Sequence, residues 1–101
     1  MTFEELQKEV LEWADNRGIL ESGDPKTQCL KFVSEAGELC DNIAKTNFYS
    51  ARDDIGDVLV TIIILSKMTN NDPVACLAEA LGVISRRKGV MTNGVFVKAE
   101  E

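Results

Sequence analysis

Two pairs of acidic residues with the same internal spacing constrain this chain more than any other feature. Glu35 and Glu38 form the first pair, and Asp54 and Asp57 form the second. Because residues three apart lie on one face of an α-helix, each pair projects two carboxylates about 4.5 Å apart along the helix axis. The short segment 46–50 separates the two helical patterns and lets them fold back on each other. The sequence therefore predicts a helical hairpin in which four carboxylates converge.

Converging carboxylates repel one another unless a cation lies among them. The chain has 17 acidic residues, 11 basic residues and no histidine, so little positive charge is at hand. Mg²⁺ prefers oxygen ligands of this kind and is the usual metal of phosphate chemistry. Three of the four acids also have explanations that need no metal. Asp54 lies in a first helical turn, where acids are favoured. Glu35 and Glu38 would be ordinary charges on a solvated helix face. Asp57 lies deeper, just before the apolar run 58–65, where an unpaired carboxylate is costly.

Composition bounds the class of protein. A chain of 101 residues with 45% hydrophobic residues predicts one globular domain spanning 1–101. The net charge of −6 argues against binding to nucleic acids or anionic membranes. The longest apolar run, 58–65, is far shorter than the roughly 20 residues of a membrane-spanning helix, and we expect no signal peptide. Cys29, Cys40 and Cys76 lie in apolar helical patterns, which predicts reduced core thiols in a cytoplasmic protein.

Hydrophobic periodicity predicts four helices and a hairpin-like tail. The expected helices span about residues 3–17, 25–45, 51–69 and 73–87, with a loop over 18–24. Their starts are marked by capping signals, namely the capping boxes Thr2/Glu5 and Ser50/Asp53 and the pairs Asp24–Pro25 and Asp72–Pro73. In the tail, Asn93–Gly94 is typical of a two-residue hairpin turn. A lone hairpin is unstable, so we expect it to pack on the helices or on a neighbouring subunit.

The faces of the two central helices predict extensive packing. The second helix carries two apolar seams, one formed by Leu30, Val33, Gly37, Cys40 and Ala44 and the other by Phe32, Ala36, Leu39 and Ile43. So wide an apolar arc indicates packing on two sides, as in a bundle with a partner subunit. The third helix is apolar almost all round from residue 58 and is expected to be central. Gly37 and Gly56 cost helix propensity, which we interpret as allowing close helix approach.

The ordered set of motifs resembles the MazG-type all-α nucleoside triphosphate pyrophosphohydrolases. Their signature is E-x-x-E, a spacer of a dozen or more residues, and E-x-x-D; here Glu35 and Glu38 are followed, after fifteen intervening residues, by Asp54 and Asp57. The resemblance covers nearly the whole chain and implies an all-α, four-helix MazG-like bundle assembled as a dimer or tetramer. Asp54 departs from the pattern, because glutamate is usual there, and so does Ser34, where another glutamate is common.

The resemblance also implies an activity, namely Mg²⁺-dependent hydrolysis of a nucleoside triphosphate between the α- and β-phosphates, with Mn²⁺ as a substitute metal. Glu35, Glu38, Asp54 and Asp57 would be the metal ligands. Since the chain lacks histidine, the general base would be a metal-activated water or a carboxylate, with Glu35 and Glu38 as candidates.

Substrate contacts are expected from residues outside this quartet. Lys31 lies one turn before Glu35 and is placed either to contact a phosphate or to pair with Glu35. The basic cluster Arg86, Arg87 and Lys88 either reaches phosphates, across a dimer if one forms, or satisfies a helix C-terminus. Trp13 either stacks on a base or belongs to the core. Further polar pocket candidates are Asn42, Lys45 and Asn47.

The competing interpretation is a non-catalytic helical oligomerisation or regulatory module that retains the MazG scaffold. Asp54 keeps this alternative open. Other carboxylate-rich or phosphate-binding classes fail on sequence: a di-iron bundle with Glu-x-x-His motifs needs histidine, and neither an EF-hand loop nor a P-loop motif is present.

Overall fold

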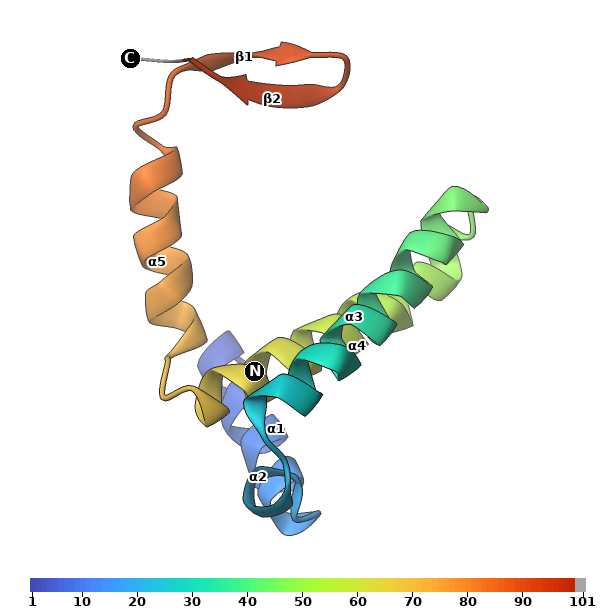
Figure 1. Ribbon diagram of the computed structural model, residues 1–101, viewed down its shortest axis with the longest axis vertical. Helices are drawn as coiled ribbons and strands as arrows, with labels where there is room; N and C mark the ends of the chain where they lie inside the picture. The colour runs from blue at the N-terminus through green and yellow to red at the C-terminus, as the bar shows by residue number, and fades with distance from the viewer. Residues whose placement is uncertain (100–101) are drawn as a thin grey trace.

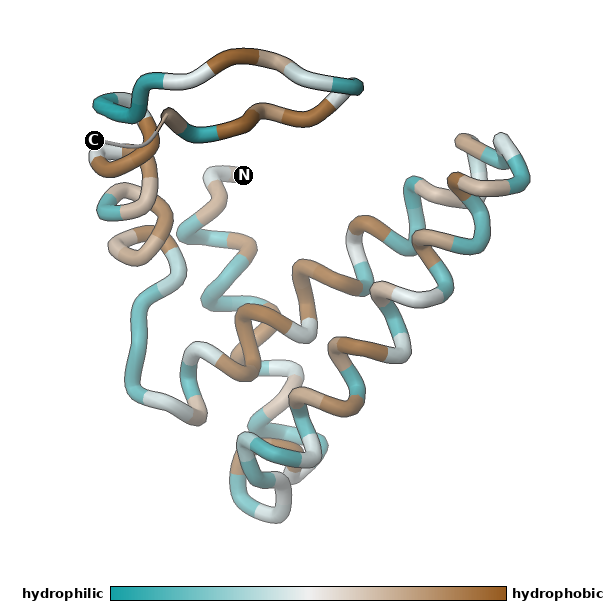
Figure 2. The backbone as a smooth tube through the Cα atoms, turned by 45° about the horizontal axis from the view of Figure 1, so that its top comes forward, coloured by the Kyte–Doolittle hydropathy of each residue, from teal (hydrophilic) through white to brown (hydrophobic). Residues whose placement is uncertain are grey.

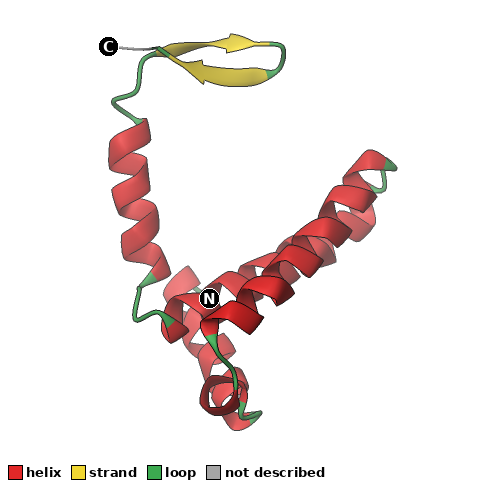
Figure 3. Cartoon of the chain, in the orientation of Figure 1, coloured by secondary structure: helices red, strands yellow, loops and turns green. Residues whose placement is uncertain are grey.

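The computed structural model describes residues 1–99, which form five helices and one hairpin (Figures 1 and 3). The elements are α1 Phe3–Asn16, α2 Ile19–Ser22, α3 Pro25–Ala44, α4 Phe48–Met68, α5 Pro73–Ile84, β1 Gly89–Thr92 and β2 Val95–Lys98. The predominantly helical fold with a C-terminal hairpin is therefore confirmed. In the described residues, no helix is long and apolar enough to cross a membrane.

Three of the four predicted helix starts follow from their capping residues. At α1, the backbone N–H of Glu5 donates to Thr2 Oγ1 and the backbone N–H of Thr2 donates to Glu5 Oε1, which completes the capping box. At α3, Asp24 accepts hydrogen bonds from the backbone N–H and the hydroxyl of Thr27, and these bonds lower the pKa of the Asp24 carboxyl. Asp72 caps α5 by accepting from the backbone N–H of Ala75.

Two local predictions were wrong. The expected loop 18–24 contains the short helix α2, which begins after Gly18 in the left-handed conformation (φ 75°). The capping box at Ser50 does not form, because α4 already begins at Phe48. Thr46 adopts a left-handed φ of 57°, so the chain reverses within residues 45–47. Ala51 is then buried inside the helical hairpin, and this tertiary packing outweighs the local capping preference at Ser50.

The antiparallel helices α3 and α4 form the scaffold on which the other helices are arranged, and α4 is the central helix. α3 and α4 run side by side, while α1 and α2 pack across the C-terminal half of α4 (Figure 1). A small core results, formed by Ala14, Ala51, Ile63 and Ile64. Gln28 on α3 donates a hydrogen bond from Nε2 to the backbone oxygen of Thr61 on α4, so a buried polar contact ties the two helices together at this end.

Helix α5 and the hairpin stand apart from the other helices. α5 meets α4 near the turn that joins them and then diverges, carrying β1 and β2 at its far end (Figure 1). The hairpin has the predicted two-residue turn, with positive φ at Asn93 and Gly94 and with Val90 paired to Val97. The radius of gyration is 16.2 Å, against about 13 Å for a compact domain of this length. The described residues of one chain thus leave the predicted four-helix bundle open.

Candidate functional site

The α3–α4 hairpin brings the four predicted carboxylates to one region. Two cross-helix hydrogen bonds define its register, Gln28 to the backbone of Thr61 at one end and Asn42 to Asp54 at the other. Glu35 and Glu38 on α3 and Asp57 on α4 lie between these contacts, with Asp54 at the second one. The predicted proximity of the acids therefore follows from the register of two antiparallel helices.

The charged side chains in this region shift the pKa values of their neighbours. The charge of Glu35 is the main cause that raises the pKa of the Glu38 carboxyl, followed by partial desolvation and by the charge of Asp54. The pKa of Lys31 is raised in turn, first by its hydrogen bond to Glu35 and then by the charges of Glu35, Glu38 and Asp57. All four acids thus contribute to one negative potential on this side of the hairpin.

The four acids differ in burial, and the expectation for Asp57 was wrong. Glu35 and Asp54 are the buried pair, at 9% and 8% exposure, while Glu38 and Asp57 are exposed. Asp54 shares the α3-facing side of α4 with the buried Ala51 and lies directly at the helix contact. Asp57 lies about 60° further round the helix, at the open edge of the contact. Asp54 is therefore the carboxylate on α4 that most needs a partner.

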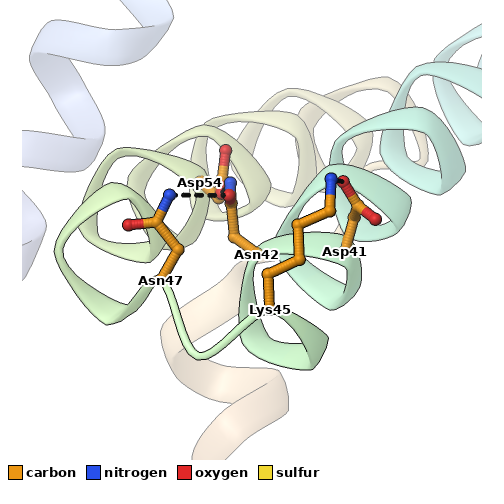
Figure 4. A network of polar contacts seen from close by, with 5 residues as sticks. All are labelled: Asp41, Asn42, Lys45, Asn47 and Asp54. Carbon is orange, nitrogen blue, oxygen red and sulfur yellow. Dashed lines mark hydrogen bonds and ion pairs between the residues drawn. The ribbon is translucent and has the colours of Figure 1, made fainter.

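Asn42 on α3 supplies that partner. Its Nδ2 donates a 2.5 Å hydrogen bond to Asp54 Oδ2, and its Oδ1 accepts a 3.4 Å bond from Asn47 Nδ2 (Figure 4). The sequence predicts both asparagines only as polar pocket residues, since nothing in it identifies their partners. Lys45, named with them, pairs instead with Asp41 at 2.8 Å.

Lys31 holds the other buried carboxylate. Its Nζ lies 2.9 Å from Glu35 Oε1, one helical turn away, with most of the lysine side chain exposed. Of the two roles expected for Lys31, the structure contains the ion pair. A phosphate contact stays a prediction, and the exposed ammonium group is accessible for it.

The four acids form a charged surface and do not form a complete metal-coordination site. In the part of the chain that the structure describes, no group of three or more acidic or cysteine side chains is arranged to hold a metal ion. Glu35 is turned toward Lys31, and Asp54 toward Asn42. The donor set nevertheless suits a hard cation, because every group is a carboxylate and the negative charges around Glu38 are only partly offset by Lys31. A bound divalent ion would relieve the repulsion that raises the pKa of Glu38.

The other predicted substrate contacts are remote from the acids in one chain. Arg86, Arg87 and Lys88 follow α5, at the end that points away from the α3–α4 hairpin (Figure 1). Trp13 lies on α1, about half exposed, with the Arg17 guanidinium 5.6 Å from its ring centroid. Their roles toward substrate stay predictions.

Two further interpretations need correction. Gly37 and Gly56 do not mark close helix approach, because a Cβ atom at either position would meet no atom of another described element within 4 Å. The cysteines are free, as expected, but Cys29, Cys40 and Cys76 are exposed and not in the core of the described chain. Both discrepancies arise where the sequence predicts packing and a single chain provides none.

Comparison with known proteins identifies the family. The MazG nucleotide pyrophosphohydrolase domain matches residues 24–87, a range that includes α3, α4, α5 and all four acids. The chain therefore belongs to the MazG nucleotide pyrophosphohydrolase family.

One curated relative comes from Haemophilus phage HP1 (strain HP1c1). It is an uncharacterized 18.2 kDa protein in the rep-hol intergenic region, 37% identical over 72 residues. The match covers 71% of this chain but only 44% of the phage protein, so the chain spans less than half of that relative. No solved structure matches the chain.

Proposed function

We propose that this chain hydrolyses nucleoside triphosphates, ribo- or deoxyribonucleotides, to the monophosphate and pyrophosphate, with Mg²⁺ or Mn²⁺ as cofactor. The observation that carries the proposal is the placement of Glu35, Glu38, Asp54 and Asp57 in one region of the α3–α4 hairpin of a MazG domain. The proposed role of the reaction is to remove or limit particular nucleotides in the cell. Free cysteines fit a reducing compartment, which supports action in the cytoplasm.

The four carboxylates would hold the metal. When bound, the ion neutralises phosphate oxygens and makes a coordinated water more acidic. Asn42 keeps the shorter side chain of Asp54 oriented, and the exposed Glu38 is free to turn toward the ion. Such fixed orientation matters because misplaced ligands weaken metal sites.

Because the chain has no histidine, proton transfer would fall to a metal-activated water or to a carboxylate. Of the two candidate carboxylates, Glu38 is the better base, since it is exposed and forms no salt bridge within the described residues. Glu35 is already committed to Lys31 at 2.9 Å. Lys31 would contact a phosphate through donor positions that Glu35 does not occupy, since an ammonium group carries three.

The test is pyrophosphate release from a panel of ribo- and deoxyribonucleoside triphosphates with Mg²⁺. We expect at least one nucleotide to be hydrolysed by the natural chain, and Glu38→Gln to abolish release while the helical circular dichroism spectrum is kept. Glu12→Gln, an equivalent change at an exposed position on α1, is the control and should retain activity. No release from any nucleotide, together with no change of melting temperature on adding Mg²⁺, would favour the non-catalytic module instead.

A further inference from the structure

Of the four acids, Asp54 receives a hydrogen bond from the opposite helix. Its side chain is 8% exposed and accepts from Asn42 on α3, whereas Glu35, the other buried acid, pairs with Lys31 on its own helix. Figure 2 shows hydrophilic stretches on both helices toward the turn of this hairpin, while the most hydrophobic stretch of α4 lies toward its other end. Near the turn, a polar pair therefore takes part in the contact that apolar side chains make further along.

The hydrogen bonds of Asn42 permit only one orientation of its amide. Its Nδ2 donates to Asp54 Oδ2 at 2.5 Å, and its Oδ1 accepts from Asn47 Nδ2 at 3.4 Å. If the amide turned over, an oxygen would face the carboxylate and two NH₂ groups would face each other, so both hydrogen bonds would be lost. The backbone also holds Asn47 in place, because its N–H donates to the carbonyl oxygen of Asn42 at 2.8 Å. Asn42 therefore presents a donor to Asp54 from a fixed side.

The side chains of Asn42 and Asp54 share one space between the helices. A longer acid at position 54 has no room beside Asn42, because the two side chains already meet at 2.5 Å, and overpacking of such a contact is destabilising. A shorter residue at position 42 leaves Asp54 buried without its donor, which is also destabilising. Made together, the two changes should compensate each other. Glutamate would fill the space that alanine vacates, and it would face Asn47 Nδ2, the donor that Asn42 no longer occupies.

We propose that Asn42 is a positioning residue for the metal site, and that Asn42 and Asp54 together take the place of a single glutamate at position 54. A glutamate would extend into the space between the helices from α4 alone. In this chain Asn42 reaches into the same space from α3 and holds the shorter carboxylate of Asp54 there. The role toward metal rests on the proposed function, in which Asp54 is a ligand, but the pairing itself does not. The departure at Asp54 then keeps a ligand in place and does not mark a lost site.

A double-mutant cycle measured by urea unfolding in EDTA tests the pairing without metal or substrate. We expect Asn42→Ala and Asp54→Glu each to lower the folding equilibrium constant about tenfold. The double variant Asn42→Ala/Asp54→Glu should lose about tenfold or less, whereas independent effects would multiply to about a hundredfold. The control cycle combines Asn42→Ala with Asp57→Glu, which adds the same methylene group at an exposed acid, and its two losses should multiply. Losses that multiply in both cycles would overturn the proposal.

The affinity for Mg²⁺, measured as the dependence of melting temperature on Mg²⁺ concentration, separates positioning from packing. Each single variant, Asn42→Ala or Asp54→Glu, should bind Mg²⁺ about 10- to 100-fold more weakly than the natural chain, and the double variant should recover most of this loss. Coupled stabilities without this recovery would show that the pair serves packing alone and would overturn the positioning role. A natural chain whose melting temperature does not respond to Mg²⁺, with coupled losses in EDTA, would overturn the proposed hydrolysis and still support the pairing.

Discussion

Asn42 donates a hydrogen bond from Nδ2 to Oδ2 of Asp54, and so connects the two helices that carry the acidic site. Asp54 is 8% exposed, so its carboxylate has little water available as an alternative partner. A buried charged acceptor that loses its donor is costly, about 1–3 kcal/mol or more. The pair therefore links the stability of the hairpin to the orientation of one proposed metal ligand.

Replacement of Asn42 by alanine should lower both stability and metal affinity. We expect a loss of about 1–3 kcal/mol in the free energy of unfolding, and Mg²⁺ affinity weaker by about 10- to 100-fold. Urea unfolding measures the first effect, and the dependence of melting temperature on Mg²⁺ concentration measures the second. Asn47→Ala is the control, since it removes only the longer bond to Asn42 and should change both less. Equal losses of stability and of Mg²⁺ affinity in the two variants would show that the Asn42–Asp54 bond contributes no more than the Asn42–Asn47 bond.

Glu38→Gln should change stability in a pH-dependent way. The folded-state pKa of Glu38 is raised, mainly by Glu35, so ionised Glu38 destabilises the fold at pH values above that pKa. In EDTA at pH 7 the variant should therefore melt slightly above the natural chain, the effect being small because the group is exposed. As the pH falls, the natural Glu38 becomes protonated in both states, and the difference should close below about pH 4.

Adding Mg²⁺ at pH 7 should reverse this order. The ion would stabilise the natural chain through four carboxylates and the variant through three. Melting curves recorded from pH 3 to 8, with EDTA and with Mg²⁺, measure both effects. A natural chain that is the more stable of the two in EDTA at pH 7 would contradict the assignment of repulsion at Glu38.

Gly56→Ala should stabilise the chain by about 1 kcal/mol, the difference in helix propensity. A Cβ atom at this position meets no atom of another described element within 4 Å, so no packing cost opposes the gain. Gly18→Ala is the contrasting variant, since its φ of 75° disfavours a side chain and should cost about 1–2 kcal/mol. Urea unfolding of both variants measures the difference. Destabilisation by Gly56→Ala would indicate that a second chain fills the space beside it.

Much of the fold could be predicted because its signals are local. Capping residues such as Thr2 and Asp24, with the apolar periodicity after them, define the helices without tertiary information. The start of α4 could not be predicted in this way, because burial of Ala51 extends the helix back past Ser50. Local preference and tertiary packing disagree there, and packing determines the result.

The site was predictable as a set of residues but not as an arrangement. The spacing of the acids predicts that they share a region, which the register of α3 and α4 supports. Whether Asp54 or Asp57 is buried depends on the rotation of α4 against α3, and the long apolar run of α4 leaves that rotation open. The divergence of α5 from α4 could not be predicted either. The apolar face of α5 indicates that something covers it but does not identify what does.

Mixing two inactive variants would reveal whether the basic cluster acts across a dimer, the assembly that the family resemblance implies. One variant is Glu38→Gln, and the other carries alanine at Arg86, Arg87 and Lys88. If the cluster of one chain serves the acids of its partner, a mixed dimer contains one intact site. Equal mixing then restores about a quarter of the natural activity, since half the dimers are mixed and each has one working site of two.

The control for this experiment mixes Glu38→Gln with Asp57→Asn. All four acids of one site lie on α3 and α4 of the same chain, so neither chain can repair the other and no activity should return. Recovery is measured as pyrophosphate release after the mixed chains are dissociated and allowed to reassociate. Absence of recovery in the first mixture, with mixed dimers demonstrated by mass, would place Arg86, Arg87 and Lys88 outside the partner's site. Their positive charge would then be explained by the C-terminus of α5 alone.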